Sequence, residues 1–302
     1  MEIQTPLVLF TLFLCLTCGL MGFEGVLLVQ GKGSRKFHLA TIITTAVALV
    51  VGGIAVFTHL KHWERIFNGF GHITSGITHE LILVVVIVIA LVALFLALRK
   101  RGEEGGIPGK AFGIIFIVIA LVGGFVTAHS YDMYARPAWN NIYLYLYYYA
   151  SLLLLGAAGI WTIAAACKEP EDVCRPAALW TLVAAVISAV VCILGMHFIA
   201  TIEPTTIEGI TFYTYDPTHP AVDPARDLAA AWSGSSSTLF WLGAVVIGCA
   251  IPALIAALAW LKKALAGKIV LPAVALVAAI AGGVCYRVAL YVVGIASYIY
   301  FF

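Results

Sequence analysis

The chain has 302 residues, of which 63% are hydrophobic and only 11% are charged. Because a water-soluble domain averages roughly 45–50% apolar and about 25% charged residues, this composition excludes a soluble protein and predicts an integral membrane protein. The formal net charge of +2 gives no reason to expect a nucleic-acid partner. The seven cysteines are odd in number and lie mostly within apolar runs, so we expect no disulfide framework.

Eight segments are apolar over the roughly 20 residues that a helix needs to cross a membrane. In chain order they cover about residues 6–29, 37–59, 79–98, 111–133, 142–166, 177–200, 238–261 and 270–299. The first is too long for the apolar region of a cleavable signal peptide, so we expect it to span the membrane. The connections are short, except for 201–237, which we expect to dock another subunit. The sequence therefore predicts one all-α integral membrane domain over residues 1–302, folded as a helix bundle.

The positions of Lys and Arg predict the orientation. The connections after the first, third, fifth and seventh helices carry 12 of these residues, and the connections on the other side carry 4. Cytoplasmic connections are enriched in Lys and Arg. We therefore expect both termini on the outside (periplasmic) face, together with the connections 59–80 and 201–237.

The connection between the second and third helices is rich in groups that titrate near neutral pH. The stretch HLKHWERIFNGFGHITSGITHE contains His59, His62, His72, His79 and Glu80, together with Arg65. Such groups are costly near lipid, so their concentration indicates proton chemistry at the outer membrane face. Oxidation of a lipid-soluble quinol releases protons, which a carboxylate or imidazole beside an apolar cleft can accept.

Glu80 is the leading candidate for the proton acceptor, because it opens the third helix just below the interface. His59 closes the second helix, and it could hold the second ring oxygen or relay the proton. Possible supporting residues are Arg65, His129, Asp132 and His197. A structural interpretation stays open for each, since a Glu in the first helical turn also suits the helix dipole and an interfacial His is often merely solvated.

Arg287 lies well inside the eighth helix, where an uncompensated charge is costly. Glu24 is the one acidic residue deep in the first helix, so we predict a structural ion pair between the two. The tyrosines at the start of the fifth helix are typical of an aromatic belt at the membrane interface. They are Tyr143, Tyr145, Tyr147, Tyr148 and Tyr149.

Three pieces of the sequence together resemble the membrane-anchor subunit of dimethyl sulfoxide (DMSO) reductase, and more distantly the quinone-reactive membrane subunits of the polysulfide-reductase type. The first is His59-Leu60, then Arg65-Ile66-Phe67-Asn68, then Glu80. The second runs from Tyr131 to Trp139, and the third is Arg287 followed by aromatic residues. The chain departs from the family in the residues before that arginine, Gly282 to Tyr286, where the family has an acidic residue.

The resemblance implies a subunit of an anaerobic respiratory molybdenum oxidoreductase in the bacterial cytoplasmic (inner) membrane. Such a subunit oxidises menaquinol near the periplasmic face, with the residues matching His59 and Glu80 at the quinol site. It carries no haem or metal of its own. Its electrons pass to an iron–sulfur subunit and then to a molybdopterin subunit that reduces an S- or N-oxide, so terminal catalysis takes place on a partner chain.

Two alternatives stay open. A haem b subunit of a related complex would need two axial His ligands on facing helices, which His129 and His197 could supply. A secondary transporter usually shows inverted repeats and polar groups near the middle of the membrane, and the sequence offers neither. The spectrum of the purified chain separates the first alternative from a subunit without haem.

Overall fold

The chain forms a bundle of long helices in a computed structural model, which describes residues 3–59, 62, 68, 70–72, 74–101, 109–134, 136–202 and 224–294. The elements are α1 (Thr5–Gln30), α2 (Arg35–His59), α3 (Gly76–Arg101), α4 (Lys110–His129), α5 (Ile142–Cys167), α6 (Glu171–Ala200), α7 (Pro224–Leu228), the π-helical segment η3 (Leu239–Ala250), α8 (Ile251–Leu261), the 3-10 turn η4 (Lys263–Leu265) and α9 (Val270–Val293). Within the described residues, 8 helices are long and apolar enough to span a membrane, η3 and α8 counting as one. The predicted all-α fold with these spans is confirmed.

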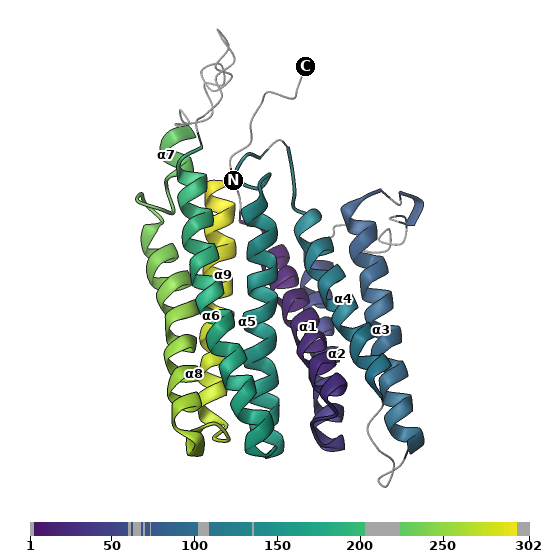
Figure 1. The fold of residues 1–302 in the computed structure, drawn as a ribbon. Coiled ribbons are helices and arrows are strands. Elements are labelled where there is room, and N and C mark those ends of the chain that lie inside the picture. Colours follow the sequence, from purple (N-terminus) through teal and green to yellow (C-terminus); the bar gives the residue numbers. More distant parts are fainter. Residues whose placement is uncertain are drawn as a thin grey trace.

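The helix bounds follow the apolar runs of the sequence closely. The fourth helix ends at His129 rather than at residue 133, and the structure describes the last one as far as Val293. The expected docking segment 201–237 lies largely outside the described residues, as does Arg65. Figure 1 shows that α1 begins and α9 ends at the same end of the bundle, so both lie on one side of a membrane; which side this is stays a prediction.

The helix α1 holds the bundle together. It packs against α2, α4 and α5, while α5 also contacts α6 and α9, and α9 contacts η3 and α8. The helix α3 contacts α4 and α2 at the edge of the bundle (Figure 1). Consequently α1 and α5 are mostly buried, whereas α2 and α3 expose long apolar faces. Such faces suit hydrocarbon rather than water.

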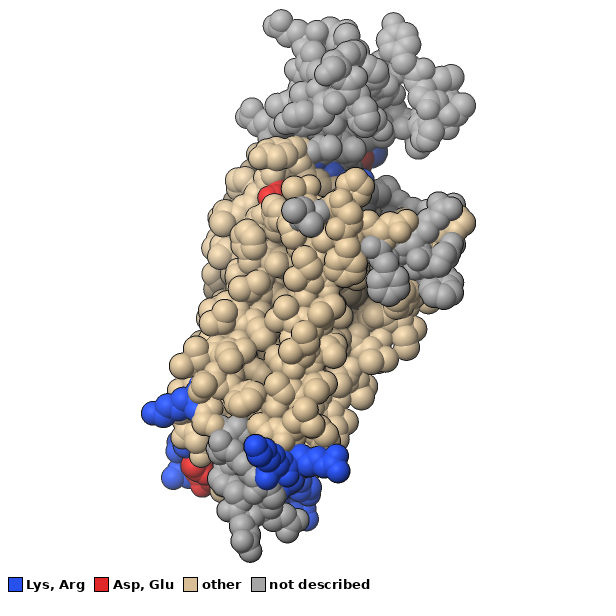
Figure 2. Space-filling model, turned by 90° about the vertical axis from the view of Figure 1, so that its right-hand side faces the viewer, with Lys and Arg blue, Asp and Glu red and all other residues tan. Residues whose placement is uncertain are grey.

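The charges divide the surface into zones. In the view of Figure 2, Lys and Arg gather at one end, and the middle of the molecule shows neither basic nor acidic side chains. We call this the basic end; it carries the connections α1–α2, α3–α4, α5–α6 and α8–α9. The termini of the transmembrane bundle and the α2–α3 and α4–α5 connections lie at the opposite end. The positive-inside rule predicts that the basic end is cytoplasmic.

Candidate functional site

Glu80 lies near the start of α3, where this helix meets the end of α4. The Ser130 hydroxyl is 3.2 Å from the Gly76 carbonyl oxygen and 3.0 Å from that of Val126, which ties the two helix ends together. The Glu80 carboxyl group makes a hydrogen bond with Ser130, but its Oε1 is shielded from solvent and has no hydrogen-bond partner among the residues that the structure describes. Because a buried polar atom without a partner is costly, this oxygen is poised to receive a hydrogen bond or a proton from a ligand.

Tyr131 connects the surroundings of Glu80 with the centre of the bundle. Its ring stacks on Tyr148 at 6.1 Å and meets Trp139 edge-on at 6.3 Å. Burial raises the pKa of the Tyr131 hydroxyl well above its usual value, and the nearby Glu80 carboxyl adds to the effect. The Trp139 indole donates to the Leu290 carbonyl at 2.9 Å, which anchors this segment to α9. Tyr131 therefore stays a neutral hydrogen-bond donor beside Glu80.

Arg287 lies in the core of the bundle and is 2% exposed. Its Nε donates to Thr11 Oγ1 at 3.0 Å and its Nη1 to the Tyr147 hydroxyl at 2.7 Å. Its Nη2 reaches the Thr11 carbonyl, Cys15 Sγ and Ser151 Oγ at 3.2–3.3 Å. Neutral groups on α1 and α5 thus hold the guanidinium, and no carboxylate of the described residues forms an ion pair with it.

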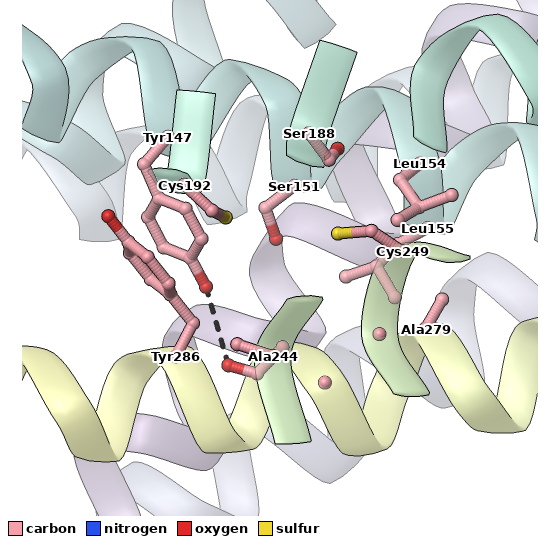
Figure 3. Close-up of a pocket in the computed structure, with 13 residues that line it drawn as sticks. Tyr147, Ser151, Leu154, Leu155, Ser188, Cys192, Ala244, Cys249, Ala279 and Tyr286 are labelled. Atoms are coloured by element: carbon pink, nitrogen blue, oxygen red, sulfur yellow. Dashed lines mark hydrogen bonds between the residues drawn. The ribbon is translucent and has the colours of Figure 1, made fainter. Parts of the chain in front are cut away.

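Two small cavities flank the Arg287 cluster, each about 20 Å³, which is room for about one water molecule. Figure 3 shows the first, where Tyr147 and Tyr286 lie side by side with ring centroids 4.0 Å apart. Ser188, Cys192 and Cys249 also line this cavity, with Cys192 next to the Tyr147 ring. The second cavity is lined by Arg287 itself together with Tyr131 and Tyr148, so polar groups extend from the cluster toward Glu80.

The predicted ion pair between Arg287 and Glu24 is wrong. Glu24 Oε1 lies 2.5 Å from Nδ1 of His38 on α2, and both side chains are at most 1% exposed. The helices α1 and α2 are antiparallel neighbours near the basic end, so their side chains meet there, while Arg287 binds Thr11 and Cys15, which lie further along α1. The sequence could not show which residues of α2 face Glu24.

A double-mutant cycle tests this pairing. Glu24→Gln and His38→Gln should each be destabilising, because a buried polar group that loses its hydrogen-bond partner costs about 1–3 kcal/mol. Their effects on the free energy of unfolding in detergent should be non-additive by about 0.5–3 kcal/mol. Glu24→Gln and Arg287→Met should add to within about 0.5 kcal/mol. Coupling of Glu24 to Arg287 instead of to His38 would contradict the observed geometry.

An apolar groove of about 320 Å³ runs between α3 and α4 on the outer surface of the bundle. Its lining residues are His79, Ile82, Leu83, Val86, Val118, Ile119, Val122 and Val126. Four of the apolar ones are 41–51% exposed, so the groove is open to the hydrocarbon that would surround the helices. His79 is its polar residue, and the next residue is Glu80, whose carboxyl group makes a hydrogen bond with Ser130.

His79 leads to a set of polar groups at the end of α4 opposite the basic end. Its ring stacks on His129 with centroids 6.2 Å apart. His129 Nδ1 lies 3.3 Å from the Tyr145 hydroxyl, which donates to Asp132 Oδ2 at 2.8 Å. Asn140 donates to the other Asp132 oxygen at 2.6 Å. His129 and Asp132 therefore belong to one set, with the Tyr145 hydroxyl between them.

The remaining predicted site residues lie apart from this set. His59 ends α2 with an exposed side chain, and the structure gives it no hydrogen bond or ring contact among the described residues. Arg65 lies outside the described residues. His197 packs on Trp232 at 5.0 Å, whereas His129 contacts His79, Phe125 and Tyr145. The two candidate haem ligands thus have different ring neighbours, and the absence of haem stays a prediction.

Several residues of the site could not be recognised from the sequence. In the sequence, His79 resembled a solvated interfacial histidine. The predicted aromatic belt was wrong for Tyr147 and Tyr148, because both are 3% exposed and point into the bundle. The helix α5 is central, so its start is covered by α1, α4 and α9. One signal was available: Leu144, Tyr148 and Ser151 recur at helical spacing on one face.

Comparison with known proteins gives the family of the chain. Searches of curated proteins and of solved structures gave no match. The family model described as DMSO reductase anchor subunit (DmsC) matches residues 1–293, essentially the whole chain. This match agrees with the membrane-spanning helices of the fold and with the resemblance drawn from His59, Glu80 and Arg287. The chain belongs to the DMSO reductase anchor subunit family.

Proposed function

We propose that this anchor subunit binds menaquinol and oxidises it near the end of the bundle where α3 begins. The observation that carries the proposal is the pairing of a buried, unpartnered carboxyl oxygen at Glu80 with a groove that opens to lipid. A quinol is apolar apart from two hydroxyl groups, so it needs access from hydrocarbon and a group that takes up its protons. Both requirements are met within two adjacent residues of α3, His79 and Glu80.

The reaction releases two protons and two electrons from each quinol. Glu80 Oε1 accepts the proton of one ring hydroxyl, and Tyr131 donates a hydrogen bond near the same position. The second hydroxyl faces an imidazole, either His79 in the groove or His59 at the end of α2. The electrons leave one at a time to an oxidised iron–sulfur cluster of the partner subunit that the family implies. That subunit passes the electrons to the molybdopterin subunit, where an S- or N-oxide is reduced.

The polar groups around His129 and Asp132 offer the protons a route to water. A proton on His79 is next to His129, and from there Tyr145 and Asp132 form a hydrogen-bonded path to the surface. The titratable and charged groups around this path are Glu80 on α3, Tyr134 in the α4–α5 connection and Arg136 close to it in sequence. Protons would then appear at the end opposite the basic end, which the positive-inside rule places in the periplasm.

The test is quinol oxidation by the assembled complex. We expect the complex of this chain with its iron–sulfur and molybdopterin subunits to oxidise a short-chain menaquinol analogue and to reduce DMSO. The partner subunits without this chain should reduce DMSO from a soluble viologen donor but not from the quinol. Equal quinol oxidation with and without the chain would contradict the proposal. A haem-type absorption band that the quinol reduces would instead favour the haem b alternative.

A further inference from the structure

A second surface feature lies at the basic end, far from Glu80. It is an open concavity of about 610 Å³ at the start of α2. This volume falls within the roughly 300–1,000 Å³ that is usual for small-molecule sites. The lining residues are Ser34, Arg35, Lys36, Leu39, Ala40 and Ile43. Cations therefore line one part of the concavity, and apolar side chains line the remainder.

Among the described residues, the two cations at this concavity lack the acidic partners that their neighbours have. Lys32 forms an ion pair with Asp172 at 3.5 Å, and Ser34 binds Glu169 through its backbone N–H at 3.1 Å and through its hydroxyl. No ion pair is formed by Arg35 or Lys36 within the described part of the chain. Nη1 of Arg35 is moreover shielded from solvent and has no acceptor. A ligand that supplies an anionic oxygen would satisfy it.

The apolar part of the concavity continues along the outside of α2. Ile43, Val47, Val50 and Ile54 follow one another at intervals of three or four residues, so they share one face of the helix. They are 56–63% exposed. This stripe begins at the concavity and runs toward the middle of the membrane. The occupant must therefore carry a negative charge at one end and a long hydrocarbon part at the other.

We propose that this concavity binds an anionic phospholipid, with its phosphate between Arg35 and Lys36 and one acyl chain on the stripe of Ile43, Val47, Val50 and Ile54. Basic pockets at the cytoplasmic ends of transmembrane helices bind acidic headgroups in this way. A free phosphate would use the cations alone and leave the stripe uncovered. The site is independent of quinol oxidation, since it lies at the other end of the bundle.

The test is lipid retention by the purified complex, measured by native mass spectrometry. Wild-type complex titrated with phosphatidylglycerol should retain at least one lipid molecule. Its retention of phosphatidylcholine should be weaker by about tenfold or by a larger factor. Arg35→Gln combined with Lys36→Gln should weaken phosphatidylglycerol retention by about tenfold. The matched control is Arg99→Gln with Lys100→Gln, which replaces two exposed cations of α3 at the basic end. This variant should leave the retention of phosphatidylglycerol unchanged. Equal weakening in both double variants would show only a general charge effect and overturn the proposal.

A second measurement uses unmodified protein, so it does not depend on whether the double variant assembles. A phosphatidylglycerol with a photoreactive group in its acyl chain is added to the wild-type complex in lipid vesicles. We expect adducts within residues 39–54 of α2, and competition by unlabelled phosphatidylglycerol but not by inorganic phosphate. Adducts spread evenly over α2, α3 and α4, or competition by inorganic phosphate, would contradict a bound phospholipid.

Discussion

Glu80→Gln is expected to reduce quinol oxidation by about 10²-fold or more, while the complex still assembles and still accepts electrons from a viologen donor. The amide has nearly the same shape as the carboxyl group, so it can keep the hydrogen bond to Ser130. It cannot take up a proton. The loss should appear in kcat for the quinol. Helix packing should be unaffected, because the amide can replace the carboxyl group in its hydrogen bond with Ser130.

The matched control for this variant is Glu171→Gln. Glu171 is an exposed carboxylate at the basic end, in the first turn of α6, so quinol oxidation should be unchanged there. Wild-type quinol activity in Glu80→Gln would remove this residue from the mechanism. Loss of viologen-driven activity in the same variant would show instead that the complex itself is damaged.

Gly19→Val is expected to prevent stable folding of the bundle. A Cβ atom at Gly19 would lie 2.2 Å from the Leu152 carbonyl oxygen and 2.8 Å from Cα of Gly156. Because both contacts are backbone atoms of α5, α1 and α5 would have to separate along their whole crossing. Overpacking of this kind costs typically 1–3 kcal/mol and more where backbone cannot move. We expect little or no complex to be recovered from membranes.

Gly53→Val provides the control, since nothing lies within 4 Å of a Cβ atom built there. It introduces the same side chain into a transmembrane helix, but on α2, and should leave yield and thermal stability close to wild type. Recovery of normal Gly19→Val complex with wild-type thermal stability would show that the α1–α5 crossing is not as close as the structure has it.

The sequence alone predicted the spanning helices, because the cost of burying unpaired backbone groups in hydrocarbon makes long apolar helices easy to recognise. His129 and Asp132 are three residues apart, but α4 ends at His129, so it is the Tyr145 hydroxyl on α5 that links them. The sequence could not predict contacts between helices. Glu24 was assigned to Arg287 rather than to His38 because the register of α1 against α2 depends on packing, to which every side chain at the interface contributes.

The same limit applies to the candidate site. Glu80 was chosen from its place at the start of a helix, but its unpartnered oxygen depends on how α4 ends at Ser130. His79 is adjacent in sequence and lines the groove. Residues of α4 form one wall of this groove, so the sequence of α3 alone could not show that His79 lines a groove instead of facing water. The roles of His59 and Arg65 stay predictions from the resemblance.

The most direct test of the account is to locate bound quinol in the assembled complex. A menaquinol analogue with a photoreactive group on its ring should label residues 76–86 of α3 and residues 118–131, at the end of α4 and just after it. Excess unlabelled menaquinol should suppress this labelling. Labelling confined to the basic end of the bundle or to a partner subunit would contradict oxidation beside Glu80.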